Sequence, residues 1–183
     1  MLIFLLIPLI MSTPNPPKTE TLRIDFGKNG NAQDWNIVND GVMGGRSQGQ
    51  GYFTDSSLVF QGEVSLDNNG GFASLRSSYQ NFDLSTYEKV VIRCKSKGVQ
   101  FAFTLNIHRQ FYLPSFKKRV AIQSDDWETI ELQLSDFYAY RLGNQLDYKL
   151  DQASLGKIIR LGFITDEKKY APFDLEIDYV EFQ

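Results

Sequence analysis

Residues 173–179 read Phe-Asp-Leu-Glu-Ile-Asp-Tyr, in which apolar and acidic side chains alternate strictly. Because successive side chains of a β-strand point to opposite faces, this alternation predicts a strand that buries Phe173, Leu175, Ile177 and Tyr179. A slip of one residue in its pairing would turn all four side chains out to water, so the strand has a defined register.

The same period of two appears in other segments of the chain. Residues 89–95 place Val90, Ile92 and Cys94 on one face, and alternation continues in further segments. Residues 101–108 and 129–134 alternate in the same way. Less regular segments that also favour strands are residues 22–26, 57–65, 72–78, 117–123 and 157–165.

Short polar or glycine-bearing segments separate the predicted strands. Lys97-Gly98 lies between two of them and predicts a tight hairpin. Only residues 135–138 and 151–155 could begin a turn of helix. Many closely spaced strands without intervening helices predict an all-β fold, an antiparallel β-sandwich.

The length of 183 residues suits one domain with a substantial core. An aromatic content of 14% also favours β structure. Residues 12–20 include Pro14, Pro16 and Pro17 and are typical of an extended tether. We therefore expect an apolar leader and tether at residues 1–20, and a single β-sandwich domain at residues 21–183.

Residues 1–11 are almost wholly apolar, but they are shorter than the roughly 20 residues that cross a bilayer. Their length matches a signal-peptide core, although no Lys or Arg precedes them. If they belong to the protein, export or membrane attachment is the favoured interpretation, and membrane contact is expected only through residues 1–11. A translation start at Met11 would instead favour a cytoplasmic location.

The charged and reactive residues argue against several classes of function. A formal net charge of −3 gives no basis for nucleic-acid binding. Cys94 and His108 are single, which excludes an internal disulfide, a Cys-rich metal site and an obvious catalytic triad. The row of Asp174, Glu176 and Asp178 could line a groove, but it is more typical of the wet face of a sheet. We expect no enzyme activity, catalytic residue, cofactor or metal site.

Two segments combine Asn or Asp with Gly, beside large apolar side chains. They are residues 35–47, with Asn39-Asp40-Gly41-Val42-Met43-Gly44-Gly45, and residues 68–76, with Asn68-Asn69-Gly70-Gly71. Such residues accept a positive φ cheaply and form shaped turns. The structural interpretation is that the first segment packs on residues 69–72 and closes one end of the sandwich. A structural calcium ion stays open as an alternative, with oxygens supplied by Asp40, Asp67, Asn68 and Asn69.

These segments give the chain a family resemblance. Trp35, the Asp-Gly-Val-Met-Gly-Gly sequence at residues 40–45, Ser47, the Asn-Gly-Gly-Phe-Ala-Ser sequence at residues 69–74, and Arg76 carry it. With later matches up to Asp178, the chain resembles the complex I intermediate-associated protein 30 family from about residue 22 to the end. Ser96-Lys97-Gly98 differs from the Gly-Asp-Gly that the family often has.

The resemblance implies a jelly-roll β-sandwich of the galactose-binding-domain-like type. It also implies a non-catalytic role, because the family's eukaryotic mitochondrial members help to assemble respiratory complex I by binding assembly intermediates. We therefore expect a protein-interaction or assembly module with a protein partner. The expected binding residues are Trp35, Asp40, Met43, Arg46, Ser47, Asn69 and Arg76.

The alternative hypothesis is a carbohydrate-binding module. Sandwiches of this type commonly display aromatic rings beside polar side chains, where sugars stack and form hydrogen bonds. The candidate residues for this function are Trp35, Tyr112, Trp127, Tyr138 and Tyr140, with His108 and Arg109.

Overall fold

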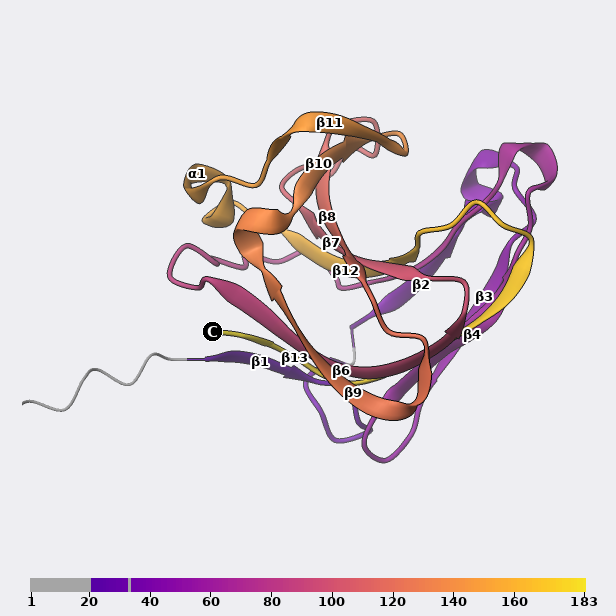
Figure 1. Ribbon diagram of the computed structural model, residues 1–183, viewed down its shortest axis with the longest axis horizontal. Helices are drawn as coiled ribbons and strands as arrows, with labels where there is room; N and C mark the ends of the chain where they lie inside the picture. Colours follow the sequence, from indigo (N-terminus) through magenta and orange to yellow (C-terminus); the bar gives the residue numbers. More distant parts are fainter. Residues whose placement is uncertain (1–20, 33) are drawn as a thin grey trace, which may run out of the picture.

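The fold is an antiparallel β-sandwich, seen in a computed structural model that describes residues 21–32 and 34–183. The leader and tether expected at residues 1–20 lie outside the described residues. Two sheets pack face to face, and every strand pairing in them is antiparallel (Figure 1). The all-β sandwich predicted from the alternating segments is therefore confirmed.

Sheet A has six strands in the described part of the chain, in the order β3-β4-β13-β6-β9, and β1 also pairs with β13. Its strands are β1 (Leu22–Asp25), β3 (Gln48–Phe53), β4 (Leu58–Val64), β6 (Lys89–Gly98), β9 (Ser124–Gln133) and β13 (Ala171–Phe182).

Sheet B, over the same described residues, has seven strands in the order β11-β10-β8-β7-β12-β5-β2. They are β2 (Asn36–Asn39), β5 (Ala73–Arg76), β7 (Phe101–Asn106), β8 (Ser115–Val120), β10 (Tyr138–Arg141), β11 (Asn144–Lys149) and β12 (Arg160–Thr165).

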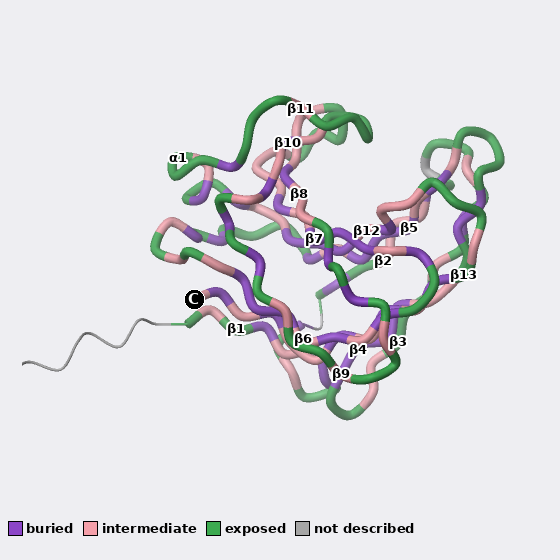
Figure 2. Tube along the Cα trace, in the orientation of Figure 1, coloured by how far each residue is buried: buried purple, intermediate pink, exposed green. Residues whose placement is uncertain are grey.

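The core lies between the two sheets, where the buried segments run (Figure 2). It is rich in phenylalanine. Phe60 and Phe173 of sheet A meet Phe101 of sheet B, with ring centroids 4.9 to 6.0 Å apart. Phe103 and Phe163, paired across β7 and β12, lie 5.0 Å apart. Each such ring contributes a large apolar area, so these contacts hold the sheets together.

The long strand β13 changes face at a bulge. Its pairing with β6 shifts register between Ile177 and Tyr179, and Val180 and Phe182 are then fully buried. An extra residue in one strand turns the following side chains to the other face. Tyr179 is thereby turned out of the core, and the prediction that it is buried was wrong. Its ring lies on the outer surface, with the Arg23 guanidinium 3.7 Å from the ring centroid.

The hairpin predicted at Lys97-Gly98 is also wrong. β6 pairs with β13 and β9 in sheet A, whereas β7 pairs with β12 and β8 in sheet B, so the chain crosses between sheets here. Gly98 has a φ of +79°, and a Cβ on it would lie 2.1 Å from the carbonyl oxygen of Pro172. The glycine thus permits a close approach to β13 at the crossover.

Four strands that the sequence did not indicate are β2, β3, β10 and β11. The two predicted helical turns are confirmed as η3 (Leu134–Asp136) and α1 (Gln152–Leu155). The other short helices are η1 (Asp40–Met43) and η2 (Asp67–Asn69). None of the helices in the described residues has the length and apolar character to cross a membrane.

Candidate functional site

Three connections gather at one end of the sandwich, at the right of the view in Figure 1. They are residues 40–47, with η1; residues 65–72, with η2; and residues 166–170, between β12 and β13. Hydrogen bonds join the first two, and a Cβ on Gly71 would lie 3.7 Å from Lys168 Cγ of the third. We call this surface the loop end.

A buried carboxylate joins the first two connections of the loop end. Asp40 is 1% exposed and accepts four hydrogen bonds. Ser47 donates two of them, from its backbone N at 2.9 Å and its Oγ at 2.6 Å. The backbone N–H groups of Gly71, at 2.7 Å, and Phe72, at 3.2 Å, donate the others. Hydrogen bonds to an ionised acceptor are about twice as strong as neutral ones, so Asp40 ties the two connections together firmly.

The glycines of both segments make room for this carboxylate. A Cβ on Gly45 would lie 2.3 Å from Asp40 Cγ, and a Cβ on Gly70 would lie 2.6 Å from Asp40 Oδ2. Asn68 and Asn69 adopt φ values of +53° and +60°, which asparagine tolerates better than most residues. The prediction that the first segment packs on residues 69–72 is confirmed.

The protonation of Asp40 follows from these contacts. Burial by itself would raise the pKa of Asp40, because a charged carboxylate loses hydration. The hydrogen bonds from Ser47, Gly71 and Phe72 outweigh that effect and hold the pKa of Asp40 below its ordinary value. Asp40 is therefore ionised at neutral pH, and both of its carboxylate oxygens accept hydrogen bonds from within the protein.

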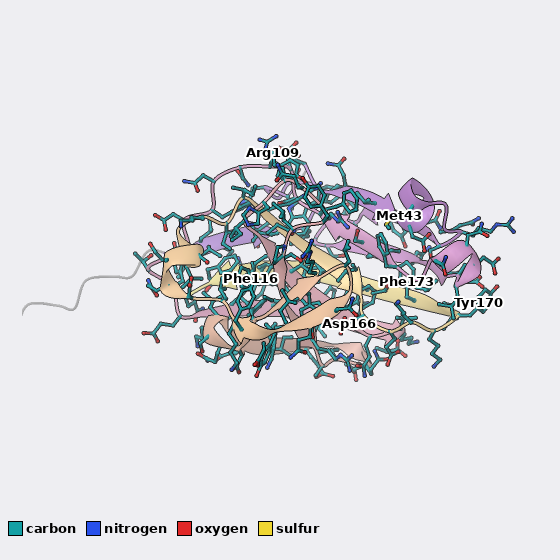
Figure 3. The ribbon with its side chains drawn as sticks, turned by 90° about the horizontal axis from the view of Figure 1, so that it is seen from above. Met43, Arg109, Phe116, Asp166, Tyr170 and Phe173 are labelled. Carbon is teal, nitrogen blue, oxygen red and sulfur yellow. The ribbon has the colours of Figure 1, made fainter. Side chains whose placement is uncertain are left out.

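Large apolar side chains from all three connections remain exposed around this rigid centre. Met43 of η1 is 62% exposed, Leu66 is 44% exposed and Tyr170 is 66% exposed. Figure 3 shows Met43 and Tyr170 at the same end of the molecule. The Tyr170 hydroxyl bonds to the Glu63 side chain, which raises the pKa of Tyr170.

Charged and polar groups lie beside these apolar side chains. Arg46 forms a long ion pair of 3.8 Å with Asp67, and both side chains are largely exposed. Asn69 is exposed, and the neighbouring Asn68 donates from Nδ2 to the carbonyl oxygen of Gly44. Of the predicted binding residues, the structure thus brings Asp40, Met43, Arg46, Ser47 and Asn69 together at the loop end.

The other two predicted residues lie elsewhere. Trp35 is in the core, with its ring 4.9 Å from Phe26 and 6.1 Å from Phe163. Contrary to expectation, its ring is not a surface on which a ligand could stack. Arg76 lies at the end of β5 on the outer face of sheet B, because Leu75 beside it points into the core.

The remaining candidates for carbohydrate binding are divided between faces. Trp127 lies on β9 of sheet A, with Arg93 and Lys95 near its ring at 4.9 and 5.0 Å. Tyr138 and Tyr140 lie on β10 of sheet B, on the face opposite the buried Ala139. Their hydroxyl-bearing rings stand beside lysines, as is typical of cation–π contacts.

Tyr112, His108 and Arg109 come from the connection between β7 and β8. Arg109 lies 4.6 Å from the ring centroid of Tyr79, and Tyr112 accepts a hydrogen bond at its carbonyl oxygen from Arg141. The strand predicted for residues 101–108 ends at Asn106, so His108 lies in this connection and not on the strand.

Acidic side chains on the outer face of sheet A are matched by cations on the next strand. Glu176 pairs with Lys95 at 2.7 Å, and Asp178 pairs with Arg93. Cys94 is buried, and burial, helped by the charge of Glu128, raises the pKa of its thiol to about 12. In the described residues no group of three or more His, Cys, Asp or Glu side chains is placed to hold a metal ion.

The sequence did not single out Leu66, Tyr170, Tyr79 or Arg160 as surface residues of interest. Leu66 and Tyr170 stand in short polar connections, where an isolated large apolar side chain was the only available indication. Tyr79 and Arg160 become neighbours through pairing between segments that are distant in the sequence, which one sequence does not reveal.

Comparison with solved structures supports the fold. A family 11 carbohydrate-binding module from Clostridium thermocellum, in complex with a mixed-linked tetrasaccharide, is similar with a TM-score of 0.60 and 17% identity, over 87% of this chain and 94% of that one. The family 11 module of the cellulase Lic26A-Cel5E from the same organism has a TM-score of 0.63 and 16% identity, over 89% and 94% of the two chains.

The agarase AgWH50C is similar with a TM-score of 0.58 and 11% identity, over 89% of this chain and 24% of that one. At these identities the likeness concerns the fold alone, a jelly-roll β-sandwich. A comparison with curated protein sequences found no match. A family model does match: that of Complex I intermediate-associated protein 30 (CIA30), over residues 24–177. The match spans nearly the whole sandwich, so the chain belongs to the CIA30 family.

Proposed function

We propose that this protein is a non-catalytic module that binds another protein through the loop end, in the manner of an assembly factor. The observation that carries the proposal is the combination of rigidity and apolar exposure at this surface. Asp40 fixes two connections, and Met43, Leu66 and Tyr170 stand exposed around it. Membership of the CIA30 family supports the same function.

A rigid surface of this kind lowers the cost of association. Ordering of loops and side chains opposes binding, and a surface already fixed by hydrogen bonds avoids much of that cost. Exposed apolar side chains bordered by polar groups are typical of protein contact sites. Arg46, Asp67 and Asn69 supply such a border here. Asp40 and Ser47 act as positioning residues, because their polar atoms are used inside the protein.

The proposal predicts that apolar contacts at the loop end retain the partner. Wild type and the double variant Met43→Ser with Tyr170→Ser are compared by affinity purification from the source cells, with quantitative mass spectrometry. A matched control replaces Tyr52 and Leu142, which are 53% and 58% exposed elsewhere on the surface. We expect a protein that wild type and the control retain and the double variant loses. An identical set of proteins from all three would contradict the proposal.

Carbohydrate binding is the second candidate, and the outer face of sheet B is the observation that favours it. Tyr138 and Tyr140 stand on this face beside Lys117 of the neighbouring strand β8. The jelly-roll sandwich is shared with family 11 carbohydrate-binding modules. Calorimetric titration with a polysaccharide panel tests this function. Binding that Tyr140→Ala abolishes would support it, and silence across the panel would eliminate it.

A further inference from the structure

Arginines divide into two groups in the described part of the chain. Four of them lie within 4.0 Å of a carboxylate: Arg23, Arg46, Arg93 and Arg119. Four others form no ion pair with any described carboxylate: Arg76, Arg109, Arg141 and Arg160. Strand pairing brings the second group to one end of sheet B. β12 pairs with both β5 and β7, and β10 pairs with β8, so the strand ends that carry or flank these arginines lie at the same end.

Arg76 and Arg160 are held by their own hydrogen bonds and still have free donors. Arg76 donates from Nε to Ser74 Oγ at 2.9 Å. Arg160 donates from Nε to the carbonyl oxygen of Ser77 at 2.9 Å, and from Nη1 to the Tyr79 hydroxyl at 3.0 Å. Both Nη groups of Arg76 and the Nη2 group of Arg160 have no protein partner among the described residues. A guanidinium group that is held in place through Nε and has free Nη donors is well suited to bind an oxyanion through two parallel hydrogen bonds.

Tyr79 organises the cluster further. Its ring centroid lies 4.3 Å from the Arg160 guanidinium and 4.6 Å from the Arg109 guanidinium. Contacts of this kind attract the cation to the ring face. Figure 3 shows Arg109 at the outer edge of the molecule, so it stands at the rim of the cluster, whereas Arg76 is partly buried.

Within residues 21–32 and 34–183, no carboxylate lies within 4.0 Å of the guanidinium groups of this cluster. Burial lowers the pKa of Arg76, and the nearby charge of Arg160 lowers it further. Arg119, on the same outer face, is neutralised by Asp166 at 3.0 Å. Two guanidinium groups that repel each other, one of them partly desolvated, gain stability when an anion joins them.

We propose that Arg76 and Arg160, with Arg109 at the rim, form a binding site for an oxyanion, a carboxylate or phosphate group carried by a ligand. The site is separate from the loop end and does not depend on a protein partner there. The free Nη groups, on the outer face of sheet B, would donate hydrogen bonds to two oxygens of the anion.

The test follows the Nε–Hε signals of the arginines by nuclear magnetic resonance in the full chain. Inorganic phosphate and acetate are titrated separately, and sodium chloride at equal ionic strength is the reference. We expect the Arg76 and Arg160 signals to shift saturably with at least one of the two anions. Saturation with phosphate alone assigns a phosphate ligand, and saturation with acetate alone or with both assigns a carboxylate-accepting site.

Variants separate this site from general electrostatics. Arg160→Gln should weaken the affinity about tenfold, as the loss of one charge-assisted hydrogen bond implies. Arg109→Gln should weaken it less, and Arg119→Gln, the matched control on the same face, should leave it unchanged. If Arg76→Gln fails to fold, the Arg160 and Arg109 variants still decide the matter. Shifts equal to those in chloride, or an affinity that Arg160→Gln leaves intact, would overturn the proposal.

Discussion

Replacement of Asp40 by asparagine perturbs the hydrogen bonds that hold residues 40–47 and 65–72 of the loop end together. If the amide oxygen takes the place of Oδ2, it keeps the bonds from Ser47 Oγ, Gly71 and Phe72. The amide NH2 then faces the backbone N–H of Ser47, which donates to Oδ1 in wild type. One buried donor therefore loses its acceptor, and the other bonds lose the help of the negative charge.

The magnitude follows from these two losses. An unsatisfied buried donor costs about 1–3 kcal/mol, and neutral hydrogen bonds are roughly half as strong as charge-assisted ones. Together they predict a loss of about 3 kcal/mol in the free energy of unfolding for Asp40→Asn. With a urea dependence of about 2 kcal/mol per M for a domain of this size, the unfolding midpoint should fall by roughly 1.5 M.

The effect should also depend on pH. The hydrogen bonds hold the pKa of Asp40 below its ordinary value in the folded state, so ionised Asp40 favours folding above the unfolded-state pKa of about 4. This contribution is lost as the pH falls through the folded-state pKa. The difference in stability between wild type and Asp40→Asn should therefore be largest near neutral pH and should shrink in strong acid.

Urea unfolding followed by circular dichroism at neutral and acidic pH measures both effects. Asp147→Asn, which changes an exposed carboxylate on β11, serves as the control and should stay within about 0.5 kcal/mol of wild type. A loss below about 1 kcal/mol for Asp40→Asn, or a difference that does not change with pH, would refute the reasoning.

Three further changes test other parts of the structure. Gly70→Ala places a Cβ 2.6 Å from Asp40 Oδ2 and should destabilise the protein by about 1–3 kcal/mol in the same urea assay. Wild-type stability would contradict the close packing of Gly70 against Asp40. Phe103→Ala, at a fully buried position between the sheets, should cost about 3–5 kcal/mol, whereas Phe111→Ala, at a 71% exposed position, should cost little; equal losses would contradict the assignment of the core. Cys94, buried and with its pKa raised to about 12, should resist iodoacetamide in the native protein at pH 8 and react after unfolding; rapid labelling of the native protein would contradict its burial.

The strands that could be predicted from the sequence are those with one buried face and one solvent-exposed face. The alternation in residues 89–95 and 173–177 matches side chains that are fully or nearly fully buried. β3 and β11 escaped prediction because each lies at an edge of its sheet and has no fully buried side chain. Glycines at residues 49 and 51 also leave β3 without an apolar pattern.

The crossover at Gly98 and the bulge near Asp178 could not be predicted locally. Both depend on which strand lies opposite, and a hairpin and a crossover between sheets can share the same two turn residues. The contact between the two Asn/Asp-Gly segments was predictable, because such residues serve shaped turns. The burial of Trp35 was not, because it depends on packing against Phe26 and Phe163, which come from other parts of the chain.

The loop end is the surface on which the proposed function depends, and site-specific photo-cross-linking tests it most directly. A photoreactive amino acid is placed at residue 43, and in a control protein at residue 142, which is similarly exposed on the turn between β10 and β11. In the source cells, we predict a discrete cross-linked protein from residue 43 that is absent from residue 142. No adduct from residue 43, or the same adducts from both residues, would contradict binding at the loop end.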